Sequence, residues 1–294
     1  MAPKPNTRAT TDPDRLAAHL IEGLPVTRQR LELAGVSTSL LEGGEGPPIV
    51  LLHGQGGFAE FMGGLISNLV DTHGVITPDL PGLGRSEVRG GTLDASGAVR
   101  WFGEVIAKTC DQPPIVLGVS MGGSIAARFA VERGDEICKL ILVDSGSLGR
   151  FRPPPSLLFA LIRFMGNPDR AGADRLQRQL FFDADRVRAQ MGDRMAALLE
   201  YQIDRARQPS VRAANRTLLR KVGMKRISDA DLRRINVPVA LLWGRHDRVN
   251  PIRHAERARA RFGWSLYPIE DAGHLPMVEQ PAAFGAALRE ILET

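Results

Sequence analysis

Short apolar runs alternate with amphipathic stretches along this chain, and this alternation restricts its possible folds more than any other feature. Six runs are rich in Val, Ile and Leu and have the length of buried strands: residues 49–53, 74–78, 114–119, 138–144, 238–243 and 265–269. Strands buried on both faces belong to parallel sheets that are covered by helices. Residues 28–34 and 36–41 alternate apolar and polar side chains instead, which fits an antiparallel pair at a sheet edge. The sequence therefore predicts an α/β fold.

The alternation stops after Asp144, and residues 146–236 contain only helical patterns. These patterns lie around residues 156–165, 174–182, 185–207 and 210–222. A chain of 294 residues is long for one ordinary domain and short for two. We therefore expect one α/β core, made of residues 1–145 and 237–294, into which residues 146–236 are inserted as a helical cap.

Positive charge is concentrated in the expected cap. Residues 146–236 hold 19 Arg and Lys against 9 Asp and Glu, whereas the rest of the chain holds 19 against 24. A basic segment attracts nucleic acid, an anionic membrane or an anionic substrate, but a solvated helix surface is the commoner explanation. We expect a small-molecule substrate, with an anionic one as an open alternative, and no nucleic-acid or membrane partner. The sequence leaves the oligomeric state open.

The first residues, 1–13, are polar and proline-containing and lack the apolar stretch of a secretory signal. No later segment approaches the roughly 20 apolar residues that a membrane-spanning helix needs. The two cysteines, Cys110 and Cys138, are too few for a disulfide framework or a cysteine-based zinc site. These features lead us to expect a soluble, cytoplasmic protein.

A glycine-rich turn, Gly118-Val119-Ser120-Met121-Gly122-Gly123, joins the run 114–119 to a helical pattern. A serine between a strand and a helix, with glycines on both sides, is the sequence of a nucleophile elbow, whose strained backbone exposes the hydroxyl. The helix N-terminus adds partial positive charge where an oxyanion would develop. A glycine-rich turn without chemistry is the alternative, but the strand, the glycines and the helix all favour the elbow. Ser120 is therefore the candidate nucleophile.

A serine hydroxyl needs a general base and a carboxylate that orients the base. Among six histidines, His274 lies in a turn-rich loop after the run 265–269, and Asp247 lies in the loop after 238–243. Reactive groups of an open parallel sheet gather outside the carboxyl ends of its strands, where the elbow also points. We therefore assign His274 as the base and Asp247 as the acid, with Asp144 and Asp271 as rival acids.

An oxyanion needs two preorganised N–H donors. The Met121 amide, directly after the nucleophile, is expected to be one donor. The glycine-rich loop His53-Gly54-Gln55-Gly56-Gly57 follows the run 49–53 and is expected to supply the other, with the Gln55 amide as first choice and Gly56 as second. No cofactor or metal is expected, because outside these residues the histidines and carboxylates lack metal-ligand spacing.

Together with the loop 79–86, these segments closely resemble the α/β-hydrolase superfamily over nearly all of residues 28–294. The order Ser120, Asp247, His274 is the order of that fold. The resemblance implies an eight-stranded sheet with one antiparallel strand and a helical cap over the active site. The stretch from Ser120 to Gly123 is similar to that of meta-cleavage product hydrolases, which split carbon–carbon bonds, and to that of cofactor-free haloperoxidases.

Other branches of the superfamily differ at informative positions. Epoxide hydrolases and haloalkane dehalogenases carry Asp at the elbow, so Ser120 disfavours their chemistry. Meta-cleavage product hydrolases usually carry Asn before the serine and Trp after the histidine, where this chain has Val119 and Leu275. Haloperoxidases usually lack so large a cap. Carboxylesterases remain the branch that the sequence favours.

These features predict a serine hydrolase that cleaves a carboxylic ester of a small molecule through an acyl-serine intermediate. A carbon–carbon bond hydrolase of the meta-cleavage type is the alternative within enzymes. A small-molecule receptor that keeps the fold is the alternative of another class, since fold alone does not establish function.

Overall fold

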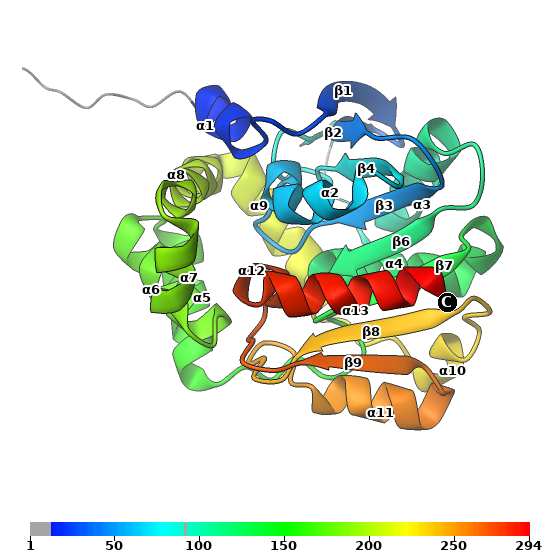
Figure 1. Cartoon of the computed structure of the whole chain (residues 1–294). Coiled ribbons are helices and arrows are strands. Elements are labelled where there is room, and N and C mark those ends of the chain that lie inside the picture. Colours follow the sequence, from blue (N-terminus) through cyan, green and yellow to red (C-terminus); the bar gives the residue numbers. More distant parts are fainter. Residues whose placement is uncertain (1–12, 91–92) are drawn as a thin grey trace, which may run out of the picture.

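The computed structural model describes residues 13–90 and 93–294, and its centre is a twisted sheet with helices on both faces (Figure 1). Eight strands form one continuous path in the order β1-β2-β4-β3-β6-β7-β8-β9. Their bounds are β1 Val26–Leu33, β2 Val36–Gly43, β3 Pro48–Leu52, β4 Gly74–Pro78, β6 Ile115–Val119, β7 Lys139–Val143, β8 Val239–Gly244 and β9 Ser265–Ile269. Within this path β2 runs antiparallel to both neighbours, and the pairs from β4 to β9 are parallel.

The expected eight-stranded sheet with one antiparallel strand is confirmed, with one addition. A ninth strand in the described residues, β5 Glu87–Val88, pairs with the start of β2. Two residues carry no detectable period, so the sequence offers no signal for this strand. β1 alternates partly buried and exposed residues, as an edge strand should, but six consecutive residues of β2 are buried. Side chains of β2 enter the apolar cores on both faces of the sheet, with Leu40 in one and Leu41 in the other, which explains its burial.

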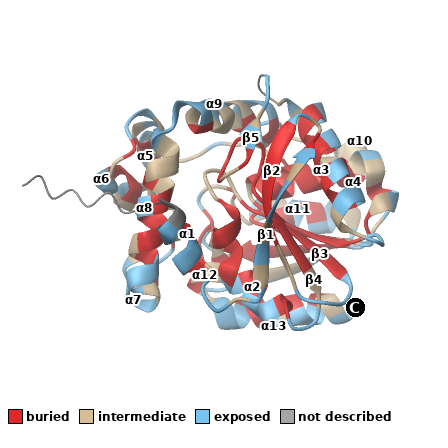
Figure 2. Cartoon of the chain, turned by 90° about the horizontal axis from the view of Figure 1, so that it is seen from above, coloured by how far each residue is buried: buried red, intermediate tan, exposed pale blue. Residues whose placement is uncertain are grey.

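Helices cover the sheet in two layers. One layer holds α3 Ala95–Thr109, α4 Met121–Arg133 and α11 Arg253–Phe262, which share one apolar core with the sheet. The other layer holds α2 Gly63–Leu69 and α13 Pro281–Glu293 with a second core. The central strands β3, β6, β7 and β8 are buried throughout or nearly so, which matches their Val, Ile and Leu content (Figure 2).

A group of helices lies between β7 and β8 in the chain and stands at the carboxyl ends of the strands (Figure 1). These inserted helices are α5 Pro155–Gly166, α6 Arg170–Leu180, α7 Ala184–Met191, α8 Asp193–Arg207 and α9 Pro209–Leu218. A π-turn at Leu219–Gly223 and the short helix α10 Asp229–Leu232 lead back to the sheet. The inserted helices have an apolar core of their own, with Phe164, Phe181, Met195 and Leu199 among its members.

Two details of the inserted helices differ from the sequence expectation. Residues 185–207 form two helices instead of one, because Gly192 adopts a positive φ of 52° and ends α7 before α8 begins. The N-terminal helix α1 Pro13–Leu20 also packs against α8, where Ala17 and Leu20 join Leu198 and Tyr201 in a small apolar cluster. The inserted helices are therefore held by a segment from the start of the chain as well.

Candidate active site

Ser120 lies at the turn between β6 and α4 in a backbone conformation that few residues adopt. Its φ and ψ are 51° and −107°, so the side chain is held away from both elements. Two of the nearby glycines are needed for this turn, because a Cβ on Gly122 would lie 2.3 Å from the Leu52 carbonyl oxygen and one on Gly118 only 2.6 Å from Gly123. The strained conformation is fixed by close packing between α4, β3 and β6, and such strain is commonest at functional sites.

The structure brings Ser120, His274 and Asp247 together. The Ser120 Oγ lies 2.9 Å from His274 Nε2, and His274 Nδ1 lies 2.9 Å from Asp247 Oδ2. Asp247 and His274 are buried, with 5% and 6% of their surface exposed. The Asp247 Oδ1 accepts hydrogen bonds from the amides of Val249 and Asn250, which fixes the carboxylate. With Nδ1–H donating to Asp247, the Nε2 lone pair is left to accept the Ser120 proton.

Asp144, the rival acid, directly follows β7 and forms no hydrogen bond with the His274 ring. Its Oδ1 accepts a hydrogen bond from the Gly244 amide at 3.0 Å. Burial, followed by the nearby charge of Asp247, raises the pKa of Asp144 well above its ordinary value. The hydrogen bond to Gly244 fits a role for Asp144 in supporting the end of β8. The other rival, Asp271, offers its carbonyl oxygen to Arg186 and Gln280.

The two expected oxyanion donors, the Met121 and Gln55 amides, belong to segments next to Ser120. Met121 is the first residue of α4, so its amide is one of those that a helix leaves without a partner. The loop after β3 lies against the nucleophile, since a Cβ on Gly54 would be 3.4 Å from Ser120 Cβ. Within residues 13–90 and 93–294, the Gln55 amide has no hydrogen-bond acceptor. The Gly56 amide instead donates to Asn215 Oδ1 at 3.2 Å, which makes Gly56 the weaker candidate.

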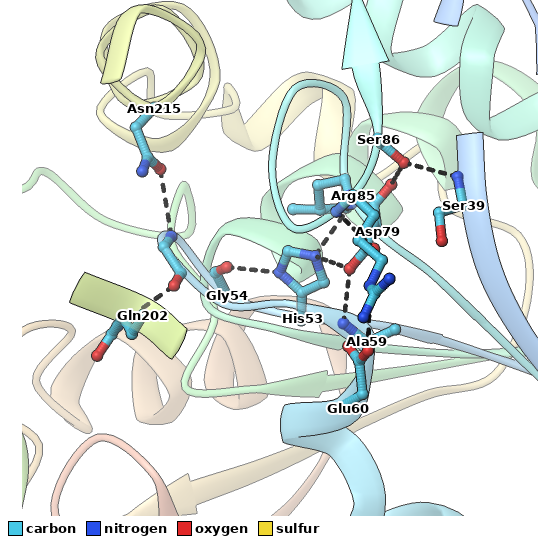
Figure 3. Close-up of polar contacts among 12 residues, drawn as sticks. Ser39, His53, Gly54, Ala59, Glu60, Asp79, Arg85, Ser86, Gln202 and Asn215 are labelled. Atoms are coloured by element: carbon cyan, nitrogen blue, oxygen red, sulfur yellow. Dashed lines mark hydrogen bonds and ion pairs between the residues drawn. The ribbon is translucent and has the colours of Figure 1, made fainter. Parts of the chain in front are cut away.

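Residues 53–57, which the sequence predicts to supply an oxyanion donor, are called here the oxyanion loop. This loop is held from the inserted helices as well as from the core (Figure 3). Gln202 on α8 donates from Nε2 to the Gly56 carbonyl oxygen at 3.2 Å, and Asn215 on α9 accepts from the Gly56 amide. The amide and the carbonyl oxygen of Gly56 are thus both hydrogen-bonded by side chains from the inserted helices. This pair of contacts links the position of α8 and α9 directly to the loop that carries Gln55.

On the core side, the buried His53 supports the same loop (Figure 3). Its Nδ1 lies 2.8 Å from the Gly54 carbonyl oxygen and its Nε2 accepts from the Leu80 amide at 3.0 Å. Burial lowers the pKa of His53 to about 4, so the ring is neutral near pH 7 and serves as one donor and one acceptor. His53 therefore has a structural role at this loop.

Behind His53, the buried carboxylates of Asp79 and Glu60 complete the support of this region (Figure 3). Asp79 accepts from the amides of Ala59 and Arg85, and Glu60 pairs with Arg28. Burial and the charge of Asp79 raise the pKa of Glu60 to about 7. The loop 79–86, which the sequence offered only as a family marker, thus packs beneath the oxyanion loop.

The histidine loop is tied to the inserted helices in a similar way. The His274 amide donates to the Leu180 carbonyl oxygen at 2.8 Å. The fully buried Glu279 accepts from the amides of Gly273 at 2.8 Å and of Phe182 at 2.6 Å, one from each side of this junction. Burial raises the pKa of Glu279, while these backbone N–H donors oppose the rise. Glu279 thus connects the loop of His274 to the end of α6.

A cavity of about 180 Å³ opens beside Ser120 and His274. Most of its wall is apolar and comes from the inserted helices: Leu157, Leu161, Phe164, Met165, Leu176, Leu180, Phe181, Met195, Leu198 and Leu199. Its polar side chains include Gln202, Asn215 and the arginines Arg212 and Arg216 of α9. Among the described residues neither arginine forms an ion pair, so both are available to an anionic group.

The arrangement suits acyl transfer, with a hydroxyl activated by a fixed imidazole beside unpaired amides at a helix N-terminus. The model of the alpha/beta hydrolase family matches residues 49–287.

The chain belongs to the alpha/beta hydrolase family.

Named relatives in this family include esterases. The chain is 27% identical over 285 residues to an uncharacterised protein of Mycobacterium tuberculosis, covering 92% of this chain and 82% of that protein. It is 25% identical over 264 residues to the pimeloyl-[acyl-carrier protein] methyl ester esterase of Aeromonas salmonicida, covering 86% of this chain and 98% of that protein.

Among solved structures, the 2-hydroxy-6-oxo-6-phenylhexa-2,4-dienoate hydrolase of a Rhodococcus strain superposes with a TM-score of 0.80. The match covers 92% of this chain and 99% of the hydrolase chain at 24% identity, and it shows a likeness of fold. No described helix of the present chain is long and apolar enough to cross a membrane.

Three residues at this site were not singled out from the sequence: Gln202, Asn215 and Glu279. Gln202 and Asn215 lie in helices whose patterns predict only amphipathic packing. Glu279 lies only five residues after His274, and this closeness to a candidate catalytic residue could have marked it as part of the site. Their partners are backbone groups, which a sequence pattern does not identify.

Proposed function

We propose that this protein is a serine hydrolase that cleaves a carboxylic ester of a small molecule through an acyl-Ser120 intermediate. The observation that carries the proposal is the continuous hydrogen-bonded series from Ser120 through His274 to Asp247, with both distances at 2.9 Å. A hydroxyl, an imidazole and a buried carboxylate in this order have the geometry of a catalytic triad. The esterase among the relatives supports an ester as the bond that is cleaved.

In the proposed mechanism, His274 Nε2 takes the proton of Ser120 Oγ as the oxygen attacks the ester carbonyl carbon. The negative charge on the carbonyl oxygen is stabilised by the amides of Gln55 and Met121. His274 then gives the proton to the departing alkoxide, which leaves as the alcohol. Water loses a proton to His274 while its oxygen attacks the acyl carbon. His274 then returns that proton to Ser120 Oγ as the bond between the acyl carbon and Oγ breaks and the carboxylic acid departs. Asp247 holds the imidazole in one tautomer and stabilises its protonated form.

The inserted helices serve as a cap in this proposal, formed by residues 146–236. Because the wall from α5, α6 and α8 is mostly apolar, the cavity suits a substrate with an extended apolar group beside the reacting carbonyl. Arg212 and Arg216 lie at the α9 side of the same cavity and favour a substrate that also carries an anionic group. The proposed substrate is therefore an apolar ester with a carboxylate or another anion at a distance from the ester.

Labelling with a fluorophosphonate tests the nucleophile directly. The native protein should form one covalent adduct, located on Ser120 by mass spectrometry, and Ser120→Ala should form none. Labelling of Ser120→Ala to the same extent would refute the assignment.

A panel of esters, lactones and dienoates tests the reaction class. We expect turnover of 4-nitrophenyl esters and little cleavage of dienoates. Efficient dienoate cleavage with no ester turnover would favour the carbon–carbon hydrolase. No turnover of any member, with tight binding of one, would favour the receptor.

A further inference from the structure

Helix α5 is apolar on both of its faces. Its inner residues Leu157, Leu161, Phe164 and Met165 line the cavity above Ser120. Its outer residues Leu158, Phe159 and Ile162 are 43%, 60% and 61% exposed. These three outer side chains, called here the α5 outer face, are three of the five exposed large hydrophobic residues in the described chain. A helix that is apolar all round is normally covered on every side, so something else is expected to contact this face.

The surroundings of the α5 outer face are basic. Residues 150–180 contain six arginines and two aspartates. Arg163, Arg170 and Arg178 pair with aspartates. Arg152, which precedes α5 by three residues, and Arg175 form no ion pair within the part of the chain that the structure describes. The Arg175 guanidinium instead lies over the Phe159 ring, 5.8 Å from its centre.

Charge decides between the possible occupants of this face. A symmetric contact with a second copy would bring Arg152 and Arg175 toward their counterparts, and like charges across an interface oppose association. An anionic lipid surface would accept the apolar side chains and the arginines together, since the apolar side chains enter the acyl region while the arginines remain at the headgroups. In Figure 2 α5 lies among the inserted helices, on the side of the molecule away from the sheet.

We propose that the α5 outer face docks on an anionic lipid surface, so that the cavity beneath α5 receives its amphiphilic ester from that surface. The delivery of the ester rests on the proposed hydrolase function, whereas the docking does not. Docking needs only the outer face and the arginines, and it places no residue inside the bilayer beyond the depth of a side chain. The same helix would then form both the attachment site and one wall of the acyl cavity.

Vesicle sedimentation with the full chain tests the docking. The Ser120→Ala variant should sediment with vesicles of phosphatidylglycerol and phosphatidylcholine, and poorly with phosphatidylcholine alone. Phe159→Ser with Ile162→Ser should weaken this partitioning at least about tenfold. Arg152→Gln and Arg175→Gln should each weaken it roughly fivefold, because each cation near such a surface contributes about that factor. Met224→Ser, a change at another exposed apolar residue, should have no effect.

Because Ser120→Ala is used, the docking result does not depend on catalysis. In a second preparation that keeps Ser120, the Phe159→Ser, Ile162→Ser variant should have native turnover of a soluble 4-nitrophenyl ester. This turnover would show that the variant is folded. Equal sedimentation with and without anionic lipid, or no sedimentation, would overturn the proposal. A dimer in light scattering that the serine changes dissociate would identify a second copy as the occupant and would also overturn it.

Discussion

The sheet edge and the inserted helices contribute to the site in different ways. The sheet edge holds Ser120, Asp247 and His274 at the ends of three parallel strands, where hydrogen bonds join their side chains and an amide of its own loop also fixes Asp247. The inserted helices hold none of these three and supply most of an apolar wall. They touch the loops of the sheet edge through a few polar contacts, at Gly56 and at the histidine loop. In the proposed function, chemistry and substrate choice are therefore carried by separate parts of the chain, which are joined by a few hydrogen bonds.

The largest expected effects come from the sheet edge. Ser120→Ala and His274→Ala should each lower kcat for an ester by several orders of magnitude, on the order of 10⁴ or more, with little change in KM. The reason is that the members of a triad act as a unit while the apolar wall still binds substrate. Steady-state kinetics with the same ester would check both variants, and the double variant should be little worse than either. More than a tenth of native turnover in either variant would contradict the assignment.

The two buried aspartates should differ sharply although they are neighbours. Asp247→Asn should lower kcat on the order of 10⁴-fold, because the amide no longer holds the required imidazole tautomer. Asp144→Asn should cost less than about tenfold, since an amide resembles the protonated carboxyl that burial favours there and its oxygen can still accept from Gly244. The reverse order of damage would make Asp144 the acid.

The contacts at Gly56 test how strongly the inserted helices control the chemistry. Asn215→Leu removes the acceptor of the Gly56 amide, and Gln202→Glu replaces a donor to its carbonyl oxygen with an acceptor. Each change should lower kcat on the order of 10- to 100-fold with little change in KM, because it displaces a loop whose donor is worth up to about 10³.

Matched variants separate positioning from general damage to the pocket. Asn215→Asp keeps an acceptor and should recover part of the lost kcat. Gln177→Glu changes another glutamine of the same cavity, which contacts Met195 instead of the oxyanion loop, and should leave kcat near native. If Gln177→Glu is as damaging as Gln202→Glu, the Gly56 contacts have no special role.

The smallest expected effect concerns charge in the inserted helices, whose excess is ten positive charges over residues 146–236. The value of kcat/KM for an anionic ester should fall as ionic strength rises from roughly 0.01 to 1 M, because the Debye length shrinks from about 30 to 3 Å. A neutral isostere should respond little, and Arg212→Gln with Arg216→Gln should remove the difference. Equal responses of the two esters in the native protein would show that the charge is only a solvated surface.

Much of the core was predictable because its signals are local. A buried strand shows as a run of Val, Ile and Leu, and the runs at 74–78 and 265–269 have the same bounds as β4 and β9. The elbow is equally local, since its glycines are next to Ser120 and are required by the close approach of α4. His274 and Asp247 followed from a general property of parallel sheets, whose carboxyl ends meet at one edge.

The break at Gly192 and the roles of Gln202, Asn215 and Glu279 depended on the tertiary structure. The hydrogen bonds from Gly56 cross 146 and 159 residues of chain, and no periodicity encodes a contact between a side chain and a distant backbone group. The choice between the candidate acids also depended on the tertiary structure. Asp144 and Asp247 both follow strands, and only the position of the His274 ring distinguishes them.

The sequence by itself determined the order of strands and helices, the position of the insertion and the choice of Ser120 as the candidate nucleophile, because each depends on residues that are neighbours in the chain. The tertiary structure decided which carboxylate contacts His274, which side chains hold the oxyanion loop, and that Leu158, Phe159 and Ile162 stay exposed on an apolar helix. A helical apolar pattern shows that a face requires a partner, but only packing shows whether the chain supplies one.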